Sequence, residues 1–199
     1  RMEGTADTYM AGVGALYASA YEHAASKRND GQAIIAMGHC HTIGGKVSED
    51  SERRIVIGGS EALSASVFDP GIAYVALGHL HLAQKVGGDP SRRYCGSPLP
   101  MSFSEIDYPH QVVVVELDGA NVSSTREIPI PRTVDLLRVP KQVASLDEVL
   151  EQLKALNLPD LPDLPESQWP YLQVRVQLTQ PEPTLRTQIE SALAGKPVR

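Results

Sequence analysis

The chain has 199 residues, 42% of them hydrophobic, and a formal net charge of −6. This length and composition indicate a globular protein that can bury one sizeable core and a small second one. No run approaches the roughly 20 apolar residues that a membrane-spanning helix requires, so a membrane protein is not expected. The acidic balance also excludes the basic footprint of whole-domain nucleic-acid binders, so any attraction to DNA must come from metal ions and local patches.

The two cysteines, Cys40 and Cys95, lie far apart in the sequence. A structural zinc site needs paired ligands at close spacing, so these two residues do not predict one. Unpaired cysteines are typical of a reducing compartment, and we expect a cytoplasmic protein.

The first part of the chain predicts a helix followed by buried strands. After Asp7 or Thr8, apolar residues recur at gaps of three and four from Met10 to Ala24, which is the pattern of an amphipathic helix. Short apolar runs then predict strands that are buried in a layered sheet, each ending in glycine. These runs are 33–37, 55–57 and 73–77. Two hairpins are expected next, with strands at 84–86 and 93–95 around a turn at 87–90, and at 111–117 and 122–128.

Alternating prolines at 128–131 predict an extended connector and a domain boundary, which divides the chain into residues 1–132 and 133–199. The second part predicts alternating strands and helices at 134–139, 145–157, 171–178 and 184–194.

Histidines follow two of the predicted buried strands. His39 follows Gly38, and His79 and His81 follow Gly78. Alternate side chains of an extended segment point the same way, and ligands gather beyond the carboxyl ends of strands in layered α/β folds. Imidazoles suit a divalent transition metal, so convergence of the three favours a metal site over solvated loop histidines. A zinc knuckle of Cys40 and His41 would need further paired ligands, and none is nearby.

Two longer segments, Tyr74–Gln84 (YVALGHLHLAQ) and Arg93–Glu105 (RYCGSPLPMSFSE), resemble the SbcD family of nuclease subunits, which are calcineurin-like metallophosphoesterases. The likeness covers nearly the whole chain. It implies an α/β fold in which 1–132 form the C-terminal part of a layered metallophosphoesterase sandwich and 133–199 form a small α+β capping domain that helps position duplex DNA.

The resemblance also implies a chemistry. His39 and His79 would bind one manganese ion and His81 a second, whereas the family position that matches His41 is not a ligand. Two manganese ions would hydrolyse phosphodiester bonds, giving a double-stranded DNA exonuclease and single-stranded DNA endonuclease of repair and recombination. Its partners would be duplex DNA and the SbcC ATPase, and the sequence leaves homodimer formation open.

The sequence departs from the family at three motifs that the family has near its amino end: Asp-x-His and Gly-Asn-His do not occur in it, and Gly-Asp occurs only as Gly88-Asp89, in the predicted hairpin turn at 87–90. These motifs supply the family's bridging carboxylates, an asparagine and the catalytic histidine. No catalytic residue is therefore assigned, and the fragment alone is expected to hold manganese weakly and not to cut DNA. The carboxylates near the histidines fit a solvated surface better than a metal site. They are Glu49, Asp50, Glu52, Glu61, Asp69 and Asp89.

Weaker candidates follow from the second segment of the resemblance. Ser97 could contact phosphate, or its hydroxyl could cap a tight turn. Arg93, with Arg92, could contact the DNA backbone or form an ordinary surface pair. The apolar residues from Met101 to Tyr108 predict core packing rather than a partner-binding patch. Two rival functions stay open: a phosphodiesterase that acts on small nucleotides or phosphoproteins, and an interaction module without catalysis.

Overall fold

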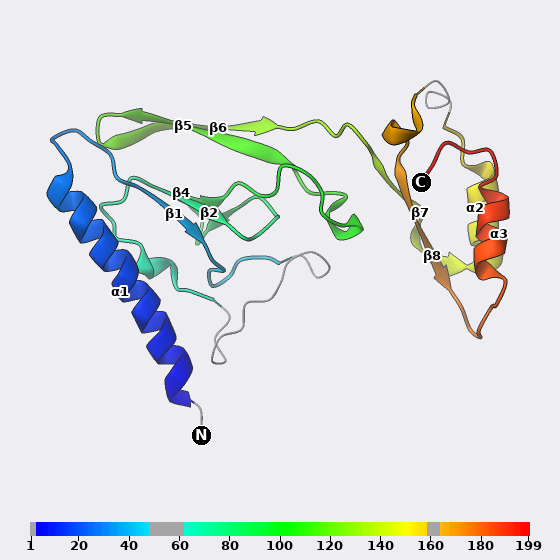
Figure 1. Cartoon of the computed structure of the whole chain (residues 1–199), viewed down its shortest axis with the longest axis horizontal. Helices are drawn as coiled ribbons and strands as arrows, with labels where there is room; N and C mark the ends of the chain where they lie inside the picture. The colour runs from blue at the N-terminus through cyan, green and yellow to red at the C-terminus, as the bar shows by residue number, and fades with distance from the viewer. Residues whose placement is uncertain (1–2, 48–61, 159–163) are drawn as a thin grey trace. The chain divides into compact units, whose positions relative to one another are not determined.

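The computed structural model describes residues 3–47, 62–158 and 164–199 (Figure 1). Helices and strands are mixed, which confirms the predicted α/β class. The chain divides into two compact units, Arg1–Pro131 and Arg132–Arg199. The strand predicted at 55–57 lies outside the described residues, as do four of the candidate carboxylates: Glu49, Asp50, Glu52 and Glu61. Among the described residues, no helix combines the length and the apolar character that crossing a bilayer requires.

A four-stranded sheet organises the first unit. Its order is β1-β2-β4-β3, in which β1, β2 and β4 run parallel and β3 is antiparallel to β4. The strands are β1 (Ile35–His39), β2 (Tyr74–Gly78), β3 (Gln84–Val86) and β4 (Asp89–Tyr94). The predicted strands at 33–37 and 73–77 are confirmed, with ends shifted by one or two residues. The shift places the glycines that precede His39 and His79 inside the strands.

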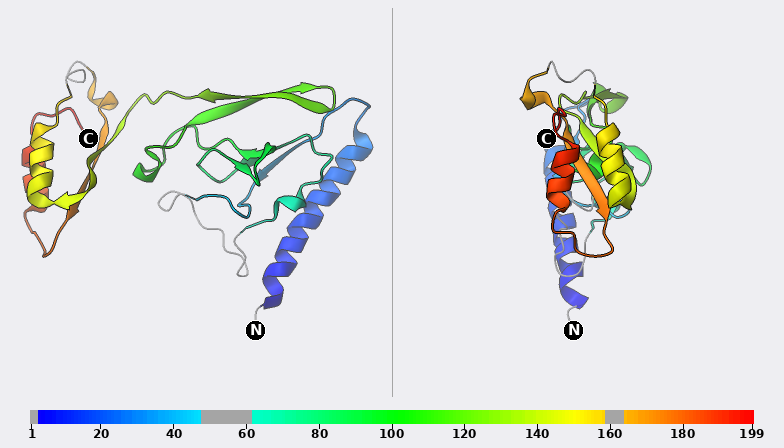
Figure 2. Two further views of the ribbon diagram at one scale, coloured as in Figure 1. Left: turned by 180° about the vertical axis from the view of Figure 1, so that it is seen from behind. Right: turned by 90° about the vertical axis from the view of Figure 1, so that its right-hand side faces the viewer.

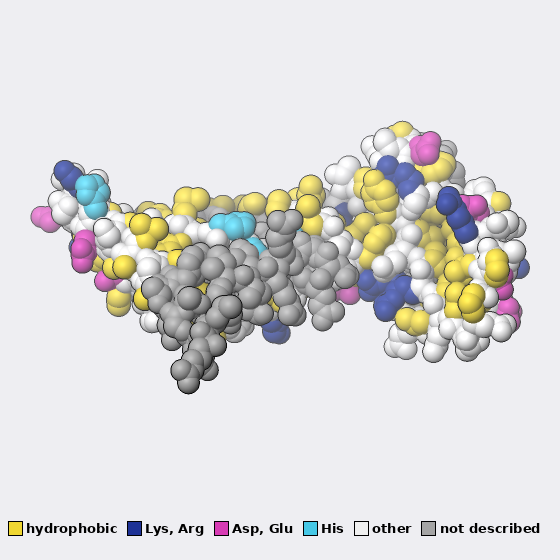
Figure 3. Space-filling view, turned by 60° about the horizontal axis from the view of Figure 1, so that its bottom comes forward, with side chains coloured by type: hydrophobic (Ala, Val, Ile, Leu, Met, Phe, Trp, Pro, Cys, Tyr) yellow, Lys and Arg dark blue, Asp and Glu magenta, His cyan; other side chains and the backbone are white. Residues whose placement is uncertain are grey.

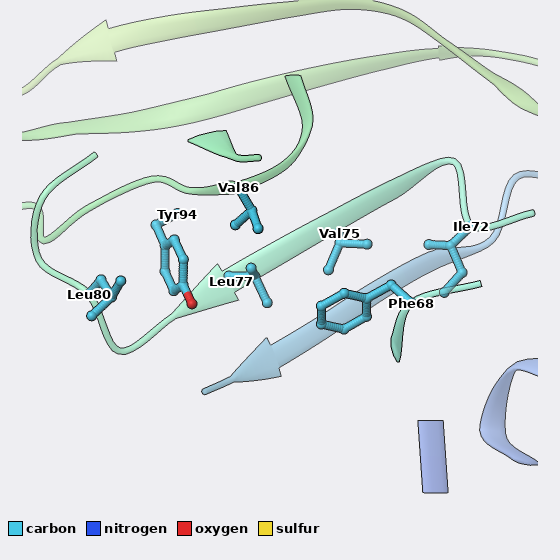
Figure 4. Close-up of a cluster of buried hydrophobic side chains, with 7 residues drawn as sticks. All are labelled: Phe68, Ile72, Val75, Leu77, Leu80, Val86 and Tyr94. Carbon is cyan, nitrogen blue, oxygen red and sulfur yellow. The ribbon is translucent and has the colours of Figure 1, made fainter. Parts of the chain in front are cut away.

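The core of the first unit lies against β2 and β4 (Figure 4). Its buried side chains are Phe68, Ile72, Val75, Leu77, Leu80, Val86 and Tyr94. The long helix α1 (Glu3–Lys27) packs onto this core through Tyr17 and Tyr21. The Tyr17 ring meets Phe68 edge to face at a centroid distance of 5.0 Å. A Cβ at Gly38 would lie 2.5 Å from the Tyr17 hydroxyl oxygen, so glycine allows α1 to approach β1 closely.

The hairpin between β3 and β4 differs from the prediction at its turn. Only Gly87 and Gly88 form the turn, with φ of 59° and 80°, and Asp89 already belongs to β4. The Asp89 carboxylate accepts hydrogen bonds from the backbone and hydroxyl of Ser91 and from Arg92. The first of these bonds satisfies the backbone N–H of Ser91 near the start of β4. The sequence alone assigned this segment to a polar turn.

A second hairpin consists of β5 (Gln111–Asp118) and β6 (Asn121–Pro129), as predicted. Its turn contains Gly119 with φ of 58°. The segment between β4 and β5 carries a short 3-10 helix, η2 (Phe103–Glu105), and another, η1 (Ala65–Val67), precedes β2.

The second unit pairs two parallel strands, β7 (Leu136–Ser145) and β8 (Tyr171–Gln177), which α2 (Leu146–Ala155) and α3 (Leu185–Ala192) cover on one side (Figure 2). A further 3-10 helix, η3 (Glu166–Gln168), precedes β8. Val149 and Leu153 are completely buried between the helices and the strands. All four predicted elements are confirmed, and β7 is longer than predicted because pairing with β8 resumes at Ala144 after an interruption.

Candidate metal centre

His39 and His79 meet at the edge of the sheet where β1 and β2 end. The parallel register pairs His39 with Gly78, so His39 and His79 emerge side by side. Their ring centroids are 5.3 Å apart, and the His41 ring lies 6.3 Å from that of His79. A Cβ at Gly78 would lie 3.0 Å from His39 Nδ1, so this glycine leaves room for the His39 ring. Histidine side chains reach the surface of this unit (Figure 3).

His79 has an unusual backbone conformation. Its φ is 103°, and among the described residues it is the one non-glycine residue with a positive φ. Such a conformation costs about 1–3 kcal/mol and persists where the surrounding structure imposes it, often at functional sites. The strained backbone directs the chain out of β2 immediately beside His39. This conformation fits the prediction that His79 is a site residue, which stays a prediction.

His81 lies against a buried carboxylate that the sequence analysis did not identify. His81 Nδ1 is 2.7 Å from Oε1 of Glu105, which is completely buried at the end of η2. The other carboxylate oxygen, Oε2, accepts a hydrogen bond of 2.9 Å from the Met101 backbone. The local sequence gave one signal, since Ser102 and Glu105 have the Ser-x-x-Glu spacing of a helix start. That pattern predicts a capping residue and not a contact 24 positions away.

The backbone of the segment after β4 supports the same histidine loop. Ser97 N donates to the His81 carbonyl at 3.0 Å. A Cβ at Gly96, whose φ is 85°, would lie 2.8 Å from that carbonyl oxygen, so only glycine allows this approach. Both the main chain and the side chain of His81 are therefore held by residues 96–105.

Tyr94 fixes the segment that carries Cys40 and His41. Its buried hydroxyl donates to the Cys40 carbonyl at 2.7 Å and accepts from the Thr42 backbone at 3.0 Å. Burial raises the pKa of the Cys40 thiol, and burial next to Cys40 raises the pKa of Tyr17. Burial therefore favours the protonated form of the Cys40 thiol, which makes it a poorer nucleophile than an exposed thiol.

The donor chemistry fits part of a transition-metal site. Two adjacent imidazoles, His39 and His79, and an oriented third, His81, are ligands that manganese accepts, but carboxylates are needed to balance the charge. The described residues include no group of three His, Cys, Asp or Glu side chains placed to hold one ion. Asp69 and Asp89, the candidate carboxylates within the described residues, bind locally to Gly71 and to Ser91 and Arg92. The assignment of the three histidines as ligands therefore stays a prediction.

The predicted substrate contacts are occupied by residues of the same chain. The hydroxyl of Ser97, which is 9% exposed, donates to the Leu99 carbonyl at 2.8 Å and thus shapes a turn. Arg93 is 5% exposed and pairs with Glu127 Oε1 at 2.5 Å. The hydrogen bond from Arg93 is the main cause that lowers the pKa of Glu127. The contacts with Leu99 and Glu127 indicate structural roles for Ser97 and Arg93. Contact of either residue with phosphate stays a prediction.

The prediction of core packing is wrong for Met101, whose side chain is 67% exposed. Its backbone N–H donates to the buried carboxylate of Glu105, while its side chain lies outside the core. Arg92 is held by Asp89 and by the Asp69 carbonyl.

This chain is similar to known proteins over nearly its whole length. It is 39% identical over 198 residues to the SbcD subunit of the nuclease SbcCD of Rhodobacter capsulatus, which covers 99% of the chain and 47% of that protein. A family model named SbcD_C and described as "Type 5 capsule protein repressor C-terminal domain" matches residues 132–199. The chain belongs to the SbcD family. It is also 37% identical over 144 residues to the SbcD subunit of Escherichia coli strain K12, covering 72% of the chain and 36% of that protein.

The SbcD homologue of Bacillus subtilis is 37% identical over 110 residues, which is 55% of the chain and 28% of the homologue. The chain thus spans about half the length, or less, of the curated relatives that it matches.

Proposed function

We propose that this chain is part of the nuclease subunit of an SbcCD-type complex, a manganese-dependent enzyme that acts as a double-stranded DNA exonuclease and single-stranded DNA endonuclease in repair and recombination. The family membership supports a nuclease, because the relatives are named as nuclease subunits. The observation that carries the proposal is the meeting of His39 and His79 at the carboxyl ends of two parallel strands, with ring centroids 5.3 Å apart.

In this proposal His39 and His79 hold one manganese ion and His81 holds a second. The bound cations supply an activated water and neutralise the charge that builds on a phosphodiester during hydrolysis. The chain itself positions the imidazoles: the register of β1 and β2 places His39 opposite Gly78 and so beside His79, and Glu105 contacts His81. The family's Asp-x-His and Gly-Asn-His motifs do not occur in this sequence, and the carboxylate of its one Gly-Asp pair, Gly88-Asp89, is bound to Ser91 and Arg92, so the chain alone binds manganese weakly and does not cut DNA.

The partners of the complete protein are duplex DNA and an SbcC ATPase, in the cytoplasm. The relatives are named as one component of SbcCD, which supports a complex with a second component. Residues 133–199 form the capping domain, and the match of the SbcD_C model to residues 132–199 supports a separate domain there. Light scattering of the full-length protein distinguishes a monomer from a homodimer.

Calorimetric titration of the chain with manganese tests the site. The expected result is weak binding that His79→Ala abolishes and that His23→Ala, a control at an exposed histidine of α1, leaves unchanged. No binding at any practical manganese concentration would favour an interaction module without catalysis.

Substrate preference tests the reaction. The full-length protein is expected to degrade duplex DNA far faster than bis-p-nitrophenyl phosphate at equal concentrations of phosphodiester. The reverse preference would favour a phosphodiesterase that acts on small substrates.

A further inference from the structure

Glu105 is a buried carboxylate whose contacts point to a role beyond local structure. Its side chain is completely buried, and ionised carboxylates are rarely found there without strong compensating bonds. Its two oxygens contact different groups: Oε1 is 2.7 Å from His81 Nδ1, and Oε2 accepts the Met101 backbone N–H at 2.9 Å. The carboxylate is therefore oriented from both sides.

The contact with Glu105 determines which nitrogen of His81 carries the proton. An ionised carboxylate only accepts, so Nδ1 donates to Glu105 when this side chain is ionised. In the neutral ring, this places the proton on Nδ1 and the lone pair on Nε2. A metal ion binds the lone pair of an imidazole, and ligand histidines commonly donate their other nitrogen to a carboxylate or a carbonyl.

Hydrogen bonds in the surrounding segment restrict the movement of Glu105 relative to His81. Ser102 begins η2 and accepts a hydrogen bond from the Ser104 backbone at 3.2 Å, which fixes the short helix that ends at Glu105. Ser97 N holds the His81 carbonyl at 3.0 Å. The ring and the main chain of His81 are thus both bound to the segment 96–105, which sets the direction of Nε2.

We propose that Glu105 is a positioning residue, which fixes the Nδ1–H tautomer of His81 and so presents Nε2 to a metal ion. The metal-binding part rests on the proposed function, whereas the control of the tautomer depends only on the contact between Glu105 and His81. Because a charge-assisted hydrogen bond opposes any other arrangement, the Nδ1–H tautomer should exceed the Nε2–H tautomer by at least about tenfold.

Glu105→Gln gives a specific expectation. The Met101 N–H still requires an acceptor, so the Gln oxygen turns toward it and the amide NH₂ faces His81 Nδ1. The NH₂ group donates, which forces Nδ1 to accept and moves the proton to Nε2. The substitution should therefore invert the tautomer of His81 with almost no change in side-chain volume.

Ser102→Ala is the matched control. It removes the cap of η2 and loosens the same short helix, but it keeps the Glu105 carboxylate. If Glu105 only stabilised η2, both substitutions would lower stability and neither would specifically invert the tautomer.

The experiment is long-range ¹H–¹⁵N correlation spectroscopy of the histidine rings in the full chain, at about pH 8, above the ordinary pKa of free imidazole. We expect Nδ1–H for His81 in the wild type and in Ser102→Ala, and Nε2–H in Glu105→Gln. Equal tautomers in the wild type and Glu105→Gln, or Nε2–H in the wild type, would overturn the inference.

Manganese added to the same samples separates this inference from the proposed function. Paramagnetic broadening should reach His39, His79 and His81 in the wild type. Because this broadening extends beyond the ligands themselves, calorimetry measures the His81 site: Glu105→Gln should weaken the binding of one manganese ion by roughly 10–100-fold and leave the other unchanged. An equal loss at both ions would contradict a role specific to His81. If manganese broadens none of the three in the wild type, the proposed metal site fails, and the tautomers alone then decide whether Glu105 controls His81.

Discussion

The positive φ of His79 predicts that glycine is more stable than alanine at this position. Alanine removes the imidazole but keeps the φ of 103°, which costs a non-glycine residue about 1–3 kcal/mol. Glycine removes the same ring and relieves the strain, but its extra freedom in the unfolded chain costs roughly 0.5–1 kcal/mol. The midpoints of these two ranges leave His79→Gly more stable than His79→Ala by roughly 1 kcal/mol.

Urea denaturation followed by far-ultraviolet circular dichroism measures this difference. Trp169 is the single tryptophan of the chain and lies in the second unit, so its fluorescence provides a reference transition for that unit. His39 supplies the matched control, because it lies in β1 and its φ is not positive. There the order should reverse, with His39→Gly less stable than His39→Ala by about 0.5–1 kcal/mol. Equal stabilities of the two His79 variants, or a more stable His79→Ala, would refute the strain at His79.

Further predictions concern packing, capping and pH. Leu153→Ala, at a completely buried position, should lower the free energy of unfolding by about 2–5 kcal/mol, whereas Leu178→Ala, at a position 41% exposed, should change it far less in the same urea titration. Ser145→Ala removes the hydroxyl that donates to Glu148 at the start of α2 and should cost about 0.5–2 kcal/mol, measured by thermal unfolding. Because Arg93 lowers the pKa of Glu127, the ion pair stabilises the fold near neutral pH, and this stabilisation is lost as the pH falls through the lowered pKa. In Glu127→Gln, the free energy of unfolding measured across the acid range should lack this pH-dependent contribution.

Most elements of the fold could be predicted from the sequence because their signals are local. Apolar runs that end in glycine marked β1 and β2, and the spacing of Val149 and Leu153 marked the buried face of α2. The start of β4 was missed because Asp89 and Pro90 are typical turn residues. In the fold, the Asp89 side chain accepts a hydrogen bond from the backbone N–H of Ser91 near the start of β4. Composition alone does not reveal this bond.

The candidate site was predictable only in part. The approach of His39 to His79 follows from two strand ends, which the apolar runs ending in Gly-His indicated, and from the parallel register of β1 and β2, which only the structure shows. Glu105 could not be found in the same way, because its partner His81 is 24 positions away and no periodic signal connects them. Arg93 looked like a surface cation, yet its pairing with Glu127 depends on the position of β6 beside β4. Long-range polar contacts of this kind depend on the tertiary fold, and single-residue chemistry does not determine them.

Anomalous diffraction from crystals of the chain soaked in millimolar manganese tests the central claim most directly. The account predicts a manganese peak within coordination distance of the ring nitrogens of His39 and His79. A peak at another site only, or none beside these two rings when they are well ordered, would contradict the assignment of this edge of the sheet as a metal centre.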